Sequence, residues 1–143
     1  MEKTKIIMGL FATDKKQITL IYNSETSIGK QTYAYTINSK KEIRSIDTSK
    51  TKITGTQWTE IAEKLDVEIQ DLVDKKHPNF KNLYSEDISL ETHDWLKILE
   101  ENPQLIQPSI LIKKEGFYLL KNPTDYLKHM ESDSAGVSRN PEK

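Results

Sequence analysis

Hydroxyl side chains gather just after the first strand predicted in this sequence, and they are the residues best placed to do chemistry. Ser24, Thr26 and Ser27 follow Asn23, and Lys30 comes shortly after them. Hydroxyls, a cation and the N–H groups of a helix N-terminus together suit a small oxyanion. The same hydroxyls are also the residue types that cap helices. Both interpretations stay open on the residues alone, and capping is the one we favour.

Thiol chemistry is excluded, because none of the 143 residues is a cysteine. The chain therefore has no disulfide, no thiolate metal site and no cysteine nucleophile. A hydroxyl is a weak nucleophile unless a base accepts its proton. The histidines His77, His93 and His129 lie far apart and have no metal-binding spacing. We expect no catalytic residue, no metal and no cofactor.

Length and charge narrow the class of protein. A chain of 143 residues suits one domain with its own core. The net charge of −1 gives no general attraction to nucleic acid or to an anionic membrane. The first residues lack a sustained apolar stretch, so we predict no signal peptide and no transmembrane span. The expected location is the cytoplasm.

Patterning predicts alternating strands and helices. The predicted strands, rich in β-branched and apolar residues, are Ile18–Tyr22, Ile43–Asp47, Ser109–Lys113 and Phe117–Leu120. The predicted helices are Ile28–Ile37, a stripe of Trp58, Ile61, Ala62 and Leu65 capped by Thr54 or Thr56, Glu68–Lys75, a helix opening at Ser89, and one starting at Asn122. Trp58 and Trp95 lie in apolar helical stripes, so we predict core positions for both.

This order predicts an α/β fold with a mixed sheet of about four strands flanked by helices. The first two strands pair in parallel through a helical crossover, and a hairpin completes the sheet. Residues 1–16 are predicted to be an N-terminal extension, residues 17–130 the domain and residues 131–143 a flexible tail.

Four segments carry a resemblance to a known family. The segment Leu99–Ile110, with its Asn-Pro-x-Leu-Ile-x-Pro-x-Ile run, resembles the signature of the arsenate reductase (ArsC)/Spx family. Ile18–Asn23, Val73–Leu83 and Asn122–Leu127 are similar to that family's first strand, middle segment and closing helix. The resemblance covers roughly residues 17–130 and implies a thioredoxin-like fold of ArsC type.

The resemblance also implies a degenerate active site. The family's redox cysteine would fall at Thr26 or one position away, in Asn23–Lys30. Gln107 stands where the family has an arginine, and a second arginine would fall near Asp74 or Lys75. Pro108 matches the proline beside the family's active loop, and Lys30 matches a basic position of its first helix.

Three functions follow as hypotheses. The first is a catalytically inactive ArsC/Spx-like domain that binds a protein partner, whose identity the sequence leaves open. The second is a small-oxyanion or glutathione-type binder that uses the helix after Asn23 with Pro108 opposite. The third is residual arsenate reduction with an external thiol, which we disfavour because the resembled enzyme's arsenic–sulfur bond has no sulfur here.

Overall fold

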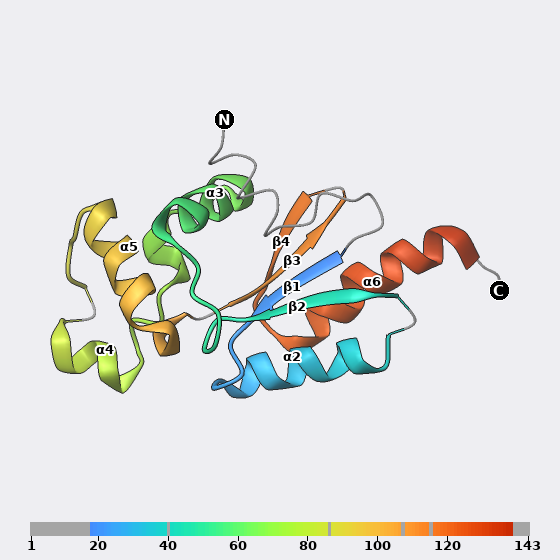
Figure 1. Ribbon diagram of the computed structural model, residues 1–143, viewed down its shortest axis with the longest axis horizontal. Coiled ribbons are helices and arrows are strands. Elements are labelled where there is room, and N and C mark those ends of the chain that lie inside the picture. Colours follow the sequence, from blue (N-terminus) through green and yellow to red (C-terminus); the bar gives the residue numbers. More distant parts are fainter. Residues whose placement is uncertain (1–17, 40, 86, 107, 115, 139–143) are drawn as a thin grey trace.

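A four-stranded sheet lies at the centre of the computed structural model (Figure 1). The structure describes residues 18–39, 41–85, 87–106, 108–114 and 116–138, and it describes side chains as far as Met130. The strands stand in the order β2-β1-β3-β4. The predicted α/β fold with a mixed sheet is therefore confirmed.

The pairing of the strands also follows the prediction. β1 (Ile18–Tyr22) pairs in parallel with β2 (Ile43–Asp47) and antiparallel with β3 (Ser109–Lys113). β3 pairs antiparallel with β4 (Gly116–Leu120), which makes the predicted hairpin. In the parallel register Tyr22 lies opposite Asp47, so the loops that follow β1 and β2 leave the same edge of the sheet.

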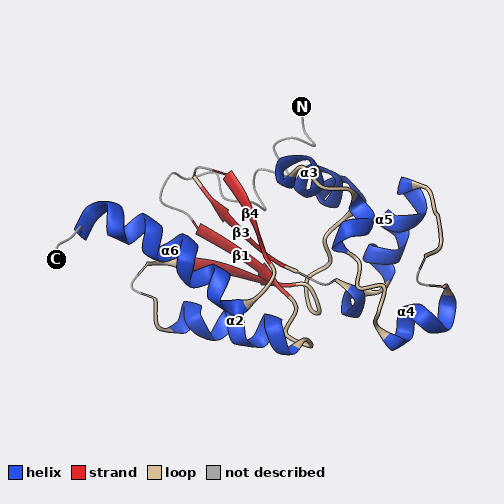
Figure 2. Ribbon diagram, turned by 180° about the vertical axis from the view of Figure 1, so that it is seen from behind, coloured by secondary structure: helices blue, strands red, loops and turns tan. Residues whose placement is uncertain are grey.

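Helices cover the sheet on both sides. α2 (Ser27–Ile37) and α6 (Pro123–Ser138) lie on one face, and the other helices form a second group, with α4 and α5 beyond one end of the sheet (Figures 1 and 2). This second group consists of α3 (Gly55–Leu65), the 3-10 turn η1 (Ile69–Leu72), α4 (Pro78–Leu83), α5 (Thr92–Glu101) and the 3-10 turn η2 (Pro103–Leu105).

The alternation of side chains along β1 divides the core into two. Ile18, Leu20 and Tyr22 pack with Tyr126 of α6. Ile21 points the other way, into the larger cluster that α3 and α5 complete. Successive strand residues face opposite sides of a sheet, and here both sides are covered, which explains why every residue of β1 is buried.

The tryptophans anchor the larger cluster, as predicted. Trp58 of α3 is 1% exposed and Trp95 of α5 is 2% exposed. Phe80 of α4 stacks on Trp95 with 5.9 Å between ring centroids. Burial of a large apolar side chain contributes about 2 to 3 kcal/mol, so these rings hold α3, α4 and α5 together.

Two helix predictions were wrong in extent. The expected helix Glu68–Lys75 is only the turn η1, because Val73 is extended and bridges to Ile106. The helix expected from Ser89 begins at Thr92. The carbonyl of Leu90 accepts a hydrogen bond from the indole Nε1 of Trp95 at 3.1 Å, a local side-chain contact that holds Leu90 outside the helix.

Neither α4 nor the length of α6 was predicted. His77 caps α4 by accepting a hydrogen bond at Nδ1 from Asn79 N at 3.0 Å. The α6 backbone continues to Ser138, beyond residue 131, where we predicted the tail to begin. The domain limits remain a prediction, and residues 1–16 lie outside the described part of the chain. No helix among the described residues has the length and apolar character needed to cross a membrane.

Candidate functional site

The loop between β1 and α2 is held by the side chain of Asn23. Its Nδ2 donates to the carbonyl of Pro103 at 2.8 Å, and its Oδ1 accepts from Glu25 N at 2.9 Å. Asn23 is 2% exposed. The amide therefore fixes the loop against the η2 turn and is not available to a ligand.

Thr26, at the position that the resemblance assigns to the cysteine, is the N-cap of α2. Its Oγ1 accepts a hydrogen bond from Gly29 N and donates one to the carbonyl of Asn23, both at 2.9 Å. A nucleophilic hydroxyl must give its proton to a base, whereas this one gives it to a main-chain carbonyl. The geometry is that of helix capping, and it does not activate Thr26.

Gly29 packs directly beneath this cap. A Cβ at position 29 would lie 2.0 Å from the carbonyl oxygen of Asn23 and 2.7 Å from Thr26 Oγ1. Since these distances are far below van der Waals contact, the tight loop needs glycine at this position. The close approach of the helix to the loop leaves no room for a ligand between Gly29 and Asn23.

Ser24 belongs to a second cluster, which sequence reasoning missed. Asp47 Oδ1 accepts from Ser24 N at 3.1 Å, from Ser49 N at 3.0 Å and from Ser49 Oγ at 2.8 Å. The two serine hydroxyls lie 3.1 Å apart. The parallel pairing of β1 with β2 is the feature that indicates this cluster, because the carboxyl ends of the two strands meet at one edge of the sheet.

The Asp47 carboxyl is held in its charged form. Burial raises its pKa, but the hydrogen bonds from Ser24 and Ser49 outweigh burial and leave the pKa below its ordinary value. A carboxylate that resists protonation is a poor general base. This cluster ties the α2 loop to the end of β2, and we assign it a structural role.

Ser27 and Lys30 are not brought together with Pro108. Both are exposed on the first turns of α2. The hydroxyl of Ser27 accepts a bond from Gln31 Nε2 at 2.8 Å. The hollow that Pro108 lines includes neither Ser27 nor Lys30. The predicted oxyanion role of these two side chains remains a prediction.

A groove of about 460 Å³ lies between the start of α2 and the start of β3. Ile28, Val67, Pro108 and Leu119 give it an apolar lining. Asp71 and Lys121 add one carboxylate and one ammonium group. Ile28 is unusually exposed for its type, at 37%. Gln107, the other residue predicted here, lies outside the described residues.

Asp74 and Lys75, near which the resemblance places the family's second arginine, make their contacts outside the groove beside Pro108. Asp74 N donates to the carbonyl of Leu105 at 2.7 Å. Lys75 Nζ donates to Gln70 Oε1 at 2.6 Å and lies 4.9 Å from the centroid of the Trp95 ring. Lys75 is thus engaged on the helical side of the molecule and does not line the groove beside Pro108.

The histidines do not converge on a metal site. His77 caps α4, His93 is exposed beside Asp94, and His129 packs on the Tyr118 ring at 4.5 Å between centroids. Among the described residues no three His, Asp or Glu side chains are arranged to hold a metal ion.

Solved structures that share this architecture include arsenate reductases. An arsenate reductase from Vibrio cholerae matches with a TM-score of 0.68 at 18% identity, over 80% of this chain and 98% of that one. A Yersinia pestis protein described as an inferred arsenate reductase matches with a TM-score of 0.67 at 20% identity, over 78% and 98%. A Bacteroides fragilis protein related to the ArsC family matches with a TM-score of 0.63 at 10% identity, over 80% and 98%.

The sequence comparisons were negative. No protein-family model matches the chain, and no curated protein matches it. At the identities above, likeness establishes the fold and not the activity. The chain therefore has the ArsC-type thioredoxin-like fold of the arsenate reductase structures, and it has this fold without a cysteine.

Proposed function

We propose that this chain is a non-catalytic ArsC-like domain that binds a segment of a partner protein in the groove beside Pro108. The observation that carries the proposal is the state of Thr26. By the resemblance, Thr26 or a neighbour within one position stands where the family has its nucleophile. The Thr26 hydroxyl is engaged as donor to the Asn23 carbonyl and as acceptor from Gly29 N, and Ile28, two residues on, lines an apolar groove.

Arsenate reduction is disfavoured on chemical grounds. The resembled enzyme forms an arsenic–sulfur bond, and this chain has no sulfur nucleophile. A threonine hydroxyl cannot be oxidised and reduced as a thiol is. Gln107 also replaces the arginine that would neutralise an oxyanion. Turnover of arsenate by the pure chain with glutathione and glutaredoxin would overturn the proposal.

The lining of the groove favours a peptide over a small anion. Ile28, Val67 and Leu119 offer apolar surface, which contributes binding energy only when a ligand has apolar groups to bury. Asp71 repels an anion, and Lys121 is the one cation among the described residues of the lining. An extended segment with an apolar side chain matches this lining better than phosphate or arsenate.

Substitution of exposed groove residues tests the proposal. Ile28→Asp introduces a charge into the groove, and Lys121→Glu reverses one. Leu83→Asp is the matched control, because Leu83 is an exposed apolar residue on α4, outside the groove. A tagged chain used as bait in native-cell extract should recover the same partner as wild type and as Leu83→Asp, and should lose it in both groove variants. Equal recovery by all four chains would contradict the assignment of the groove.

The alternative is a small-oxyanion or glutathione-type ligand at the same place. Lys121 in the groove and the first turn of α2 beside it favour this candidate. A ligand at 100 times its Kd stabilises a protein by about 2.7 kcal/mol, which raises the unfolding midpoint by several degrees at this size. We expect phosphate, sulfate, arsenate, arsenite and reduced glutathione to give no such shift. A shift from one of them, lost in Lys121→Glu, would favour the alternative.

A further inference from the structure

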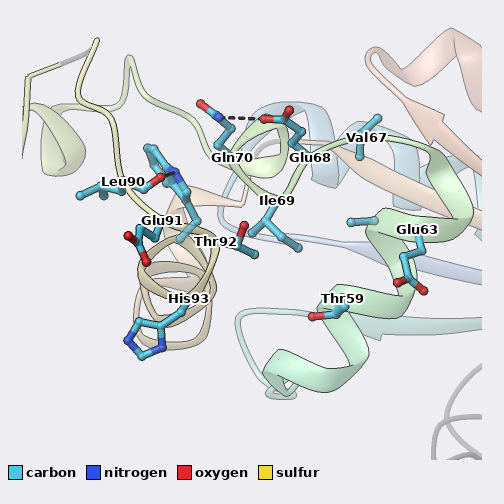
Figure 3. Close-up of a pocket in the computed structure, with 12 residues that line it drawn as sticks. Thr59, Glu63, Val67, Glu68, Ile69, Gln70, Leu90, Glu91, Thr92 and His93 are labelled. Carbon is cyan, nitrogen blue, oxygen red and sulfur yellow. Dashed lines mark hydrogen bonds between the residues drawn. The ribbon is translucent and has the colours of Figure 1, made fainter.

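A second and larger hollow lies on the helical side of the molecule, away from the position of the lost cysteine. It is an open hollow of about 790 Å³, bordered by α3, η1 with the residues leading into it, and the start of α5 with the residues before it (Figure 3). Ala62, Ile69 and Trp95 are the buried residues of its lining, and Val67 and Leu90 are half-buried.

This hollow continues along the two helices. A neighbouring hollow of about 510 Å³ shares Thr59 and His93 with it, and the described residues that line it belong to α3 and α5. On the α3 side the described lining of the second hollow consists of Gly55, Thr56 and Thr59, whose side chains are small or absent. Together the two hollows form one groove along α3 and α5, which we call the α3–α5 groove.

Carboxylates dominate the rim of the α3–α5 groove. Its lining includes five glutamates and one lysine: Glu63, Glu68, Glu91, Glu100, Glu101 and Lys97. Glu100 accepts a hydrogen bond from Gly55 N, so its carboxylate is partly engaged at the N-terminus of α3. Within the described part of the chain, Glu63, Glu68 and Glu91 form no ion pair. Lys75 lies at one end, engaged with Gln70 and Trp95.

The backbone around the groove decides what kind of segment fits. A partner strand needs a free sheet edge for its N–H and C=O groups, and the edges of this sheet are β2 and β4. The described residues that line the groove come from helices, a 3-10 turn and short loops and include no strand, so the groove offers no strand edge and an occupant must satisfy its own backbone. A helix does so. The ten residues of α5 span about 15 Å, which equals roughly three turns of a docked helix.

From this combination we propose that the α3–α5 groove binds a basic amphipathic helix of a partner protein. Apolar side chains of that helix lie over Ile69 and Val67, and its Lys or Arg side chains reach the glutamate rim. The surface is distinct from the groove beside Pro108 and does not depend on the proposed function. Among the described lining residues, Val67 is the one that the two share.

A titration with designed peptides tests the proposal on the full chain. The probe is a synthetic helix with Leu at positions i, i+3, i+4 and i+7 and Lys elsewhere. Its control has each Lys replaced by Glu. Binding is followed by amide chemical shifts of the labelled protein. The Lys peptide should move the amides of residues 59–70 and 91–101, and the Glu peptide should not. No shift at millimolar Lys peptide, or equal shifts with both peptides, would overturn the proposal.

Matched variants separate the groove from general charge attraction. Glu63→Gln with Glu91→Gln removes two exposed rim charges. It should weaken binding of the Lys peptide by about fivefold to tenfold, as expected for two surface ion pairs. Glu25→Gln with Glu42→Gln makes the same change in net charge outside the groove and should leave the Kd unchanged. Equal weakening in both pairs, or shifts confined to the Ile28 side, would refute the site.

Discussion

Replacement of Gly29 by alanine should destabilise this protein, although alanine normally favours helices. Gly29 lies in the first turn of α2, where a Gly to Ala change contributes up to about 1 kcal/mol of stability when space allows. Here the new Cβ would lie 2.0 Å from the carbonyl oxygen of Asn23 and 2.7 Å from Thr26 Oγ1. Both atoms belong to the cap of α2, so the loop must move.

The expected size follows from these contacts. Overpacking against backbone costs about 1 to 3 kcal/mol, and partial loss of the Thr26 cap adds about 1 kcal/mol. Subtracting the gain in helix propensity of about 1 kcal/mol leaves a net loss of about 1 to 3 kcal/mol. The free energy of unfolding in urea, measured for Gly29→Ala and wild type, gives this difference directly.

Gly55→Ala is the matched control. Gly55 also lies in the first turn of a helix, α3, but its added Cβ would meet the carboxylate end of Glu100 at 3.2 Å. A flexible side-chain end can move by a few tenths of an ångström, so we expect a change below about 1 kcal/mol. Equal stability of Gly29→Ala and Gly55→Ala would refute the tight packing of the α2 cap, and with it the account of Thr26 as a capping residue.

Three further predictions follow from the same contacts. Thr26→Ala should lower the free energy of unfolding by about 1 kcal/mol, and Thr26→Ser should restore most of it, as urea denaturation of both will show. The pKa of Asp47 is lowered in the folded state, so the stability that this carboxylate contributes is complete above the ordinary pKa of 3.8 and is lost as the pH falls through the folded pKa. The free energy of unfolding of Asp47→Asn should therefore depend less on pH than that of wild type between about pH 5 and about pH 2. The pKa of His129 is lowered from 6.5 by burial and by Lys113, so the unfolded chain binds a proton at a higher pH than the folded protein does. The stability of the folded state should therefore decline as the pH falls below 6.5, and it should decline less in His129→Gln. Thermal unfolding across this pH range measures the difference.

Local signals explain which elements were predictable. The strand Ile18–Tyr22 was placed correctly because β-branched residues end at a turn, and α2 followed because its cap lies among three hydroxyl residues. The helix start predicted at Ser89 was wrong, because Leu90 lies outside the helix with its carbonyl bonded to the indole of Trp95, a side-chain contact that the helical pattern does not show. The predicted helix Glu68–Lys75 was too long, because Val73 forms a bridge with Ile106, which is distant in the sequence.

The site was predictable only in part. Asn23, Thr26 and Pro108 were identified, and the structure gives the first two packing and capping contacts. Asp47 was missed because its link to Ser24 exists only once β1 and β2 pair in parallel. Val67 and Leu119 join Ile28 in the groove from segments far apart in the chain. Such a groove depends on the strand order and the helix packing, which no local pattern encodes.

Photo-cross-linking from position 28 is the most direct test of the central claim, that this domain binds a protein segment in place of thiol chemistry. A benzoylphenylalanine at Ile28 lies in the groove beside Pro108, and one at Leu83 is the exposed control. The account predicts a discrete protein cross-link in native cells from position 28, absent from position 83 and lost when Lys121→Glu is added. No cross-link from position 28, or the same products from both positions, would contradict it.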